Sequence, residues 1–206
     1  MDEQMKNILR YALILFLIAA VVAGLLAGVN LLTKDTIAQN EIAAEQQALG
    51  EVMPDAQTFE AFDAEVAQGF GVAAVYAAAD AAGTARGYCV KVAQNGYGGA
   101  ISAVVGVGLD GKVTGVSIIS HAETPGLGAN IEKDSFRQQY TGKGAVTVVK
   151  AGAKGSEINA VSGATISSKA LTAGVNKAVE VTQQIQNGIV PEMDTNPESG
   201  EVGADE

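Results

Sequence analysis

Apolar residues dominate the N-terminal end of the chain and then change their spacing. Residues 11–29, YALILFLIAAVVAGLLAGV, carry no charge. As a helix they would span about 28 Å, close to the hydrocarbon core of a bilayer. Residues 35–50 keep apolar positions on one side of a helix that continues the first. A cleavable signal peptide has a shorter apolar region and a small-residue cleavage site, so this run predicts an uncleaved transmembrane helix over residues 11–32.

Beyond residue 70 the apolar residues gather in short stretches that are typical of β-strands. Asp110-Gly111 between two such stretches is a hairpin signal, and from Leu171 to Ile185 the spacing is that of an amphipathic helix. The pattern predicts an α+β fold, an antiparallel sheet with flanking helices, preceded by one N-terminal transmembrane helix. The expected strands are residues 72–79, 84–93, 101–108, 113–120 and 145–150.

Charge adds an orientation and a tail. Lys6 and Arg10 precede the apolar run and Lys34 follows it, so the positive-inside rule favours a cytoplasmic N-terminus in a single-pass inner-membrane protein. The formal net charge is −10, and the end of the chain holds six acidic residues without a basic one, which predicts a disordered tail. The expected parts are a cytoplasmic tail (1–10), a transmembrane helix (11–32), an extracytoplasmic domain (33–190) and a disordered acidic tail (191–206).

Composition excludes several classes of function. The sequence has no basic patch of the kind that binds nucleic acid, so a nucleic-acid partner is not expected. His121 is the one histidine and Cys89 the one cysteine, so neither a metal-ligand set nor an intrachain disulfide is expected. No Gly-x-Gly-x-x-Gly follows a predicted strand, so the chain is expected to have no NAD site of its own.

The most informative segment is a small-residue loop before the last predicted helix, Ser162-Gly163-Ala164-Thr165. Free N–H groups and the helix dipole favour a phosphate at such a helix start, and Gly163 and Ala164 leave room for a bulky group. The alternative is an ordinary capped turn with Ser162 or Thr165 as the N-cap. From the residues alone both interpretations stay open.

The segment from Asn159 to Thr165 resembles the flavinylation motif of the FMN-binding domain family, Asp-x-x-(Ser/Thr)-Gly-Ala-Thr. The resemblance implies that a separate flavin transferase esterifies Thr165 to the phosphate of FMN. Ser162, Gly163 and Ala164 would then belong to the cofactor site. One position departs from the motif, because Asn159 stands where the family has Asp.

A second segment, HAETPGLG over residues 121–128, resembles a signature shared by two related families of membrane subunits. One comprises the G subunits of Rnf electron-transport complexes, the other the C subunits of sodium-translocating NADH:quinone reductases. Pro125 and the glycines can shape a backbone turn that packs closely on a flat ring. The segment is therefore predicted to contribute to the flavin pocket through His121, Glu123, Thr124, Gly126, Leu127 and Gly128.

A third segment leaves two interpretations open. The Gly-rich stretch from Asn95 to Gly99 is either a tight turn or a surface that faces the flavin. If it faces the flavin, Tyr97 is the residue there that could stack on a ring.

The two motifs imply a membrane-anchored flavoprotein subunit that carries electrons through covalently bound FMN. The resemblance is strongest to the Rnf type, whose complexes couple ferredoxin:NAD electron transfer to ion translocation. The implied partners are the other membrane subunits of that complex, with the flavin transferase during maturation. The alternatives are a C subunit of the quinone reductase, a free-standing membrane flavoprotein, and a membrane-anchored binding domain without a cofactor.

Overall fold

The computed structural model describes residues 3–189 and divides the chain into two units, one ending at Ala44 and one beginning at Glu45. The acidic tail predicted over 191–206 lies outside the described residues. The described residues of the first unit are helical, because the long helix α1 runs from Glu3 to Val52. Its apolar part has a mean hydropathy of 2.9, and by length and composition the helix can cross a membrane. The predicted N-terminal apolar helix is confirmed.

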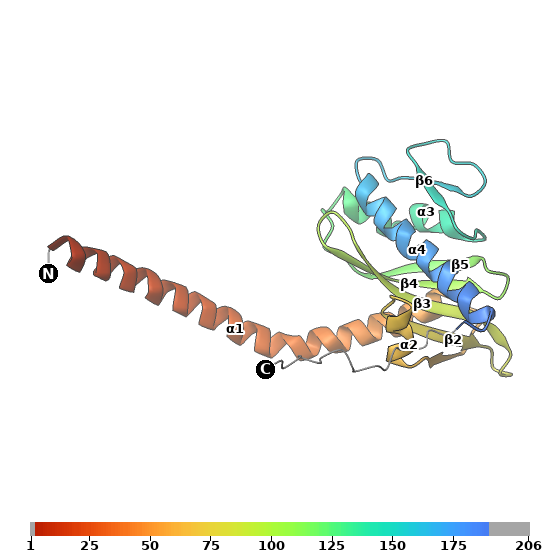
Figure 1. Ribbon diagram of the computed structural model, residues 1–206, viewed down its shortest axis with the longest axis horizontal. Helices are drawn as coiled ribbons and strands as arrows, with labels where there is room; N and C mark the ends of the chain where they lie inside the picture. Colours follow the sequence, from red (N-terminus) through yellow and green to blue (C-terminus); the bar gives the residue numbers. More distant parts are fainter. Residues whose placement is uncertain (1–2, 190–206) are drawn as a thin grey trace, which may run out of the picture. The chain divides into compact units, whose positions relative to one another are not determined.

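The second unit is built on a five-stranded antiparallel sheet in the order β1-β2-β3-β4-β5 (Figure 1). Each strand pairs with the next in sequence, so the sheet is a meander. Its strands are β1 (Thr58–Ala61), β2 (Ala74–Ala79), β3 (Ala85–Asn95), β4 (Ala100–Gly108) and β5 (Val113–Ser120). The α+β class and the antiparallel sheet agree with the prediction.

The remaining elements follow the sheet or interrupt it. The helices are α2 (Ala64–Gly69), η1 (Gly128–Glu132), α3 (Asp134–Arg137), η2 (Gln138–Tyr140) and α4 (Thr165–Gln186). Two short strands, β6 (Thr147–Val149) and β7 (Glu157–Asn159), pair in parallel as a separate sheet. The strand expected at 145–150 thus exists but does not join the main sheet. The sequence analysis missed β1, β7, α2 and α3, which are short and lack a sustained apolar period.

Successive side chains of a strand point to opposite faces of the sheet, so the sheet contributes to two separate cores, one on each face. Val90 and Val92 of β3 pack with α4 in the larger core, whereas Cys89 faces the smaller core on the opposite side. The last turns of α1, with Leu49 and Val52, fill that smaller core. The sheet is therefore sandwiched between α4 and the C-terminal end of α1.

A glycine pair seats the end of α1 on the sheet. Gly106 and Gly115 are cross-strand partners in β4 and β5. A Cβ atom on Gly106 would lie 2.6 Å from the carbonyl oxygen of Val52, and one on Gly115 would lie 2.9 Å from its Cα. The hydroxyl of Thr114 donates to the same Val52 carbonyl at 2.6 Å. Only strands without side chains at this point let the helix backbone approach so closely.

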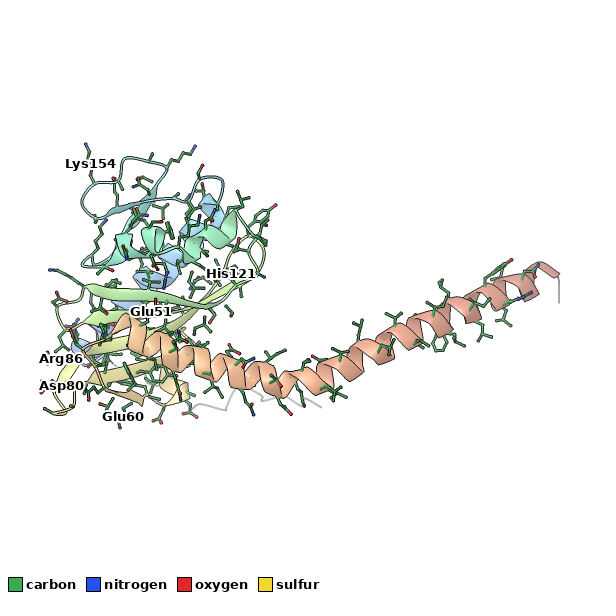
Figure 2. All side chains as sticks on the ribbon, turned by 180° about the vertical axis from the view of Figure 1, so that it is seen from behind. Glu51, Glu60, Asp80, Arg86, His121 and Lys154 are labelled. Atoms are coloured by element: carbon green, nitrogen blue, oxygen red, sulfur yellow. The ribbon has the colours of Figure 1, made fainter. Side chains whose placement is uncertain are left out.

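Polar contacts reinforce this seat. Glu51, labelled at the end of α1 in Figure 2, accepts hydrogen bonds from Ser117 and Arg137, each at 2.7 Å. Burial raises the pKa of Glu51, but the bonds from Ser117 and Arg137 outweigh it and hold the pKa below its ordinary value. Earlier in α1, Glu45 accepts hydrogen bonds from Lys91 at 2.7 Å and from the Tyr76 hydroxyl. The end of α1 is thus part of the folded second unit.

Replacing Gly106 by Ala should lower the free energy of unfolding by about 1–3 kcal/mol, because the added methyl collides with the Val52 backbone. Chemical denaturation of the full chain in detergent measures this. Gly50→Ala is the matched control, since Gly50 lies in α1 with open space around it. It should raise stability by up to about 1 kcal/mol. Equal effects of the two variants would contradict the close packing of the Val52 backbone on Gly106.

Candidate functional site

The loop that leads into α4 ends in an unusual helix start. Gly163 has φ +76°, a left-handed conformation that favours glycine, and α4 begins at Thr165. The N-cap residue is Ala164, and no side chain caps the helix. The capped turn with Ser162 or Thr165 as the N-cap, one of the two interpretations of the sequence, is therefore not the geometry observed.

Uncapped, the first turn of α4 keeps its polar groups available. The first helical hydrogen bond at this end runs from the Ser168 N–H to the Ala164 carbonyl at 3.0 Å. The N–H groups of Thr165, Ile166 and Ser167 lie before it and have no helical acceptor. The half-buried Thr165 also has a hydroxyl without a hydrogen-bond partner within residues 3–189. This helix start suits a phosphate, because N–H donors and the helix dipole favour an anion there.

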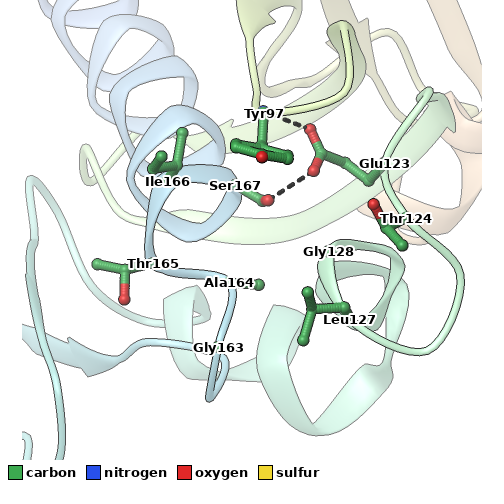
Figure 3. A pocket seen from close by; sticks show the side chains of 10 residues that line it. All are labelled: Tyr97, Glu123, Thr124, Leu127, Gly128, Gly163, Ala164, Thr165, Ile166 and Ser167. Atoms are coloured by element: carbon green, nitrogen blue, oxygen red, sulfur yellow. Dashed lines mark hydrogen bonds between the residues drawn. The ribbon is translucent and has the colours of Figure 1, made fainter.

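A cavity of about 410 Å³ opens beside this helix start (Figure 3). Its volume lies within the range of small-molecule sites in proteins. Three segments that are distant in sequence form its walls: the β3–β4 turn, the loop after β5, and the beginning of α4. The lining residues are Tyr97, Glu123, Thr124, Leu127, Gly128, Gly163, Ala164, Thr165, Ile166 and Ser167.

Glu123 joins these three segments (Figure 3). Its side chain is buried, and its Oε1 accepts the backbone N–H groups of Tyr97 at 2.7 Å and Gly98 at 3.1 Å. Its Oε2 accepts the hydroxyl of the buried Ser167 at 2.7 Å. Both carboxylate oxygens are therefore engaged with the protein. Glu123 shapes the cavity from its own loop by holding the turn on one side and α4 on the other.

Glycines make room for this carboxylate. A Cβ atom on Gly96 or on Gly128 would collide with a carboxylate oxygen of Glu123, and one on Gly98 would collide with the carbonyl oxygen of Ala122. The backbones of the turn and of the 121–128 loop can close around the buried charge only because these positions lack side chains.

The environment keeps this buried group ionised. Burial raises the pKa of Glu123, but the hydrogen bonds from Ser167, Gly98 and Tyr97 outweigh burial and hold the pKa below its ordinary value of 4.5. A carboxylate that accepts three hydrogen bonds stabilises the fold more when it is charged than when it is neutral, because charge-assisted hydrogen bonds are the stronger ones.

The structure gathers most of the predicted site residues at the cavity but not all of them. Thr165, Gly163, Ala164, Glu123, Thr124, Leu127 and Gly128 line it. Ser162 lines a second cavity, with Val161, Asn159 and Gln139. His121 is directed elsewhere: its Nδ1 accepts the Glu123 N–H at 3.0 Å and its Nε2 lies 3.0 Å from Glu132. Gly126, with φ +74°, turns the loop without lining the cavity.

Three lining residues were absent from the predicted set. Tyr97 lies in a tight turn closed by the Gly96 N–H and the Gly99 carbonyl at 2.8 Å, and it also lines the cavity. The tight turn is confirmed, and a surface that faces the flavin stays a prediction. Ile166 and Ser167 follow Thr165 directly. Ile166 lies off the apolar stripe of α4, so an exposed apolar residue beside Thr165 could have been recognised from the sequence as a candidate for the site. The sequence gives no comparable sign for Ser167.

The chain matches two known family descriptions. Residues 96–180 match the FMN-binding domain, and residues 1–52 match the RnfG N-terminal region. The first match spans the β3–β4 turn, the 121–128 loop and most of α4. It therefore covers every residue that lines the cavity.

Curated relatives resemble the chain over most of its length. The G subunit of the proton-translocating ferredoxin:NAD(+) oxidoreductase complex of Clostridium ljungdahlii is 39% identical, covering 80% of this chain and 85% of the relative. The Na(+)-translocating counterpart of Acetobacterium woodii is 38% identical, covering 87% and 94%. Among solved structures, NqrC of Shewanella oneidensis matches with a TM-score of 0.50 at 22% identity, over 67% of this chain and 73% of that one. That likeness concerns the fold alone.

Removing the carboxylate of Glu123 should destabilise the second unit. Glu123→Ala leaves two N–H groups and a hydroxyl without their acceptor, which should cost about 2–3 kcal/mol of unfolding free energy at pH 7. Glu123→Gln should cost less, since its amide oxygen can still accept. Glu65→Gln, an exposed change on α2, is the control and should have almost no effect. Denaturant unfolding of each full-length variant measures this.

The same variants have a defined pH dependence. Because the pKa of Glu123 is lower in the folded protein, its stabilising contribution is complete above about pH 4.5 and is lost as the pH falls through the folded pKa. The stability gap between the wild type and Glu123→Gln should therefore shrink on acidification. A gap that stays constant from pH 7 to pH 3 would contradict the charged state.

Proposed function

The chain belongs to the family of G subunits of Rnf-type ion-translocating oxidoreductase complexes, and we propose that it carries electrons through FMN esterified to Thr165. It is a membrane-anchored FMN-binding subunit of such a complex. The observation that carries the proposal is the position of Thr165, which lines a cavity and begins helix α4.

The cavity fits the chemistry of FMN. The open N–H groups of the first turn of α4 suit the phosphate, and the walls suit a flat aromatic ring. Three apolar side chains around the cavity are exposed: Tyr97 at 73%, Leu127 at 45% and Ile166 at 56%. Large apolar groups that gather at one exposed place indicate a binding site. Bound FMN supplies the electron transfer, and the protein fixes its position and surroundings.

The neighbouring hydroxyls are less suitable acceptors than Thr165, because they either form hydrogen bonds within the protein or line another cavity. Ser167 is buried and donates to Glu123. Ser168 is buried and donates to the Ala164 carbonyl at 2.9 Å. Ser162 lines the second cavity. Among the hydroxyls of this loop and the first turn of α4, Thr165 therefore combines access to the 410 Å³ cavity with a free donor.

Attachment requires an activated phosphoryl donor, because a hydroxyl and a phosphate monoester do not condense spontaneously in water. A flavin dinucleotide bound by the transferase meets this need. The Thr165 Oγ forms a bond to the phosphorus of the FMN half, and the bridging P–O bond breaks. The nucleoside monophosphate leaves with the bonding electrons, and the hydroxyl proton passes to a base of the transferase.

The alternatives receive less support. The match to the FMN-binding domain argues against a binding domain without a cofactor. The curated relatives at 38–39% identity are G subunits, whereas the resemblance to NqrC concerns the fold. We also propose that residues 33–190 form an extracytoplasmic domain. This domain would contact the other membrane subunits of the complex.

Thr165→Ala should abolish covalent FMN, because it removes the acceptor oxygen. The full chain is produced with a flavin transferase, and peptide mass spectrometry locates the flavin. The wild type should carry FMN less water on Thr165. Thr84→Ala, an exposed change in the β2–β3 turn, is the matched control and should load fully. Modification of Ser162, Ser167 or Ser168 in the wild type would refute the assigned acceptor.

Orientation has its own test. Cys89 is fully buried, so a cysteine introduced at the exposed Ala81 would be the accessible thiol of the second unit. On intact cells an impermeant maleimide should label Ala81→Cys. Asn7→Cys, on the opposite flank of the apolar run, should react after lysis only. The reverse pattern would contradict the proposed extracytoplasmic domain.

A further inference from the structure

The loop that presents Thr165 is held at both ends. We call residues Asn159–Ser168 the acceptor loop. At its beginning, Gln139 of η2 forms a reciprocal pair with the backbone of Asn159. The Gln139 Oε1 accepts the Asn159 N–H at 2.8 Å, and the Gln139 Nε2 donates to the Asn159 carbonyl at 3.3 Å. One amide side chain thus satisfies both backbone groups of the residue at which the loop leaves β7.

The side chain of Asn159 adds a third bond. Its Oδ1 accepts the N–H of Ala153 at 3.0 Å, which ties the acceptor loop to the β6–β7 connection. The Ala160 N–H continues the attachment by donating to the Val149 carbonyl at 2.8 Å. The first two residues of the loop are therefore fixed to two neighbouring segments.

Ser168 holds the other end. Its Oγ accepts the Val161 N–H at 3.0 Å and donates to the Ala164 carbonyl at 2.9 Å. Behind it, the Tyr140 and Thr172 hydroxyls lie 2.8 Å apart, and Thr172 donates to the Ser168 carbonyl at 2.7 Å. Tyr140 follows Gln139 directly in η2, so one short helix supports both ends of the loop.

Between Ala160 and the start of α4 at Thr165, Ser162 and Gly163 are the exposed residues. The backbone forms a narrow arch here, with Gly163 at its tip (Figure 3). The side chain of Leu127 lies against Gly163, where a Cβ atom would come within 2.8 Å of its Cδ1. Gly163 lines the cavity beside Thr165, and Ser162 lines the second cavity of about 300 Å³ together with Gln139 and Asn159.

We propose that Gln139 and Asn159 are positioning residues for flavin attachment, which hold the acceptor loop in the conformation that the transferase requires. The proposal rests on the proposed attachment at Thr165. Neither residue lines the cavity beside Thr165, so they act through the loop backbone. An acceptor hydroxyl on a fixed loop avoids the entropy cost of ordering the loop in the encounter, and small displacements of reacting groups have large effects on rate.

The same geometry explains the departure from the flavinylation motif. Asn159 uses its Oδ1 as an acceptor for a backbone N–H, and a carboxylate at this position offers the same acceptor. In this chain the required feature is therefore the acceptor atom and not a negative charge. Asn159→Asp should preserve attachment, whereas Asn159→Leu, which removes the acceptor at similar size, should impair it.

The experiment measures initial rates of FMN attachment to the purified full-length chain by a flavin transferase. The substrate is flavin adenine dinucleotide, and the concentration of the chain is varied. Gln139→Ala and Asn159→Leu should each lower kcat/KM by roughly tenfold. Asn159→Asp should stay within about twofold of the wild type. Gln138→Ala is the matched control, because this exposed neighbour of Gln139 lies beside a different hollow and should react normally.

A second readout separates positioning from general instability. Hydrogen–deuterium exchange of the peptide covering residues 157–164 should accelerate in Gln139→Ala, while peptides of β3 and β4 keep their protection. Wild-type rates in both Gln139→Ala and Asn159→Leu would overturn the proposal and leave attachment at Thr165 intact. A slow rate accompanied by loss of β3 and β4 protection would also overturn it, since the residues would then support the fold and not the loop. Failure of the wild type to react at Thr165 would instead refute the proposed function.

Discussion

The geometry of the site depends on one buried carboxylate. Glu123 accepts hydrogen bonds from the β3–β4 turn and from α4, and its own loop forms the third wall of the cavity. A buried charge is costly unless each of its oxygens is paired, so the three segments must meet in one arrangement for the charge to be tolerated. The arrangement also requires glycine at positions 96 and 128, because a side chain at either position would collide with the Glu123 carboxylate. Glu123 thus converts three distant segments into one defined cavity.

The rest of the second unit keeps that cavity in place. The packing of α4 on β3 fixes the axis along which its N-terminus points, and Gly174 allows the close approach, since a Cβ atom there would lie 2.9 Å from Val92. The end of α1 is seated on the opposite face of the sheet through Gly106 and Gly115. A cofactor bound at this site would therefore rest on rigid elements, which an electron carrier with a defined potential needs.

Much of this arrangement could be predicted from the sequence, and the misses have physical causes. The apolar run of α1 and the short apolar stretches of β2 to β5 are strong local signals, and the structure bears out both. Thr165 and the 121–128 loop were singled out by their motifs, and the structure brings them to one cavity. Gln139 and Ser167 were missed because their importance comes from tertiary hydrogen bonds that leave no local pattern. The role of Glu123 as a buried tie, likewise, depends on partners about 25 and 44 residues away.

Time-resolved fluorescence anisotropy of the FMN-loaded full chain tests the central claim most directly. If the flavin is esterified to Thr165 and its ring lies in the cavity organised by Glu123, the anisotropy should decay only with the slow tumbling of the protein in its detergent micelle. A ring tethered by its phosphate alone would rotate on the picosecond-to-nanosecond timescale of exposed side chains. A dominant fast component in the wild type would therefore contradict the account of the site.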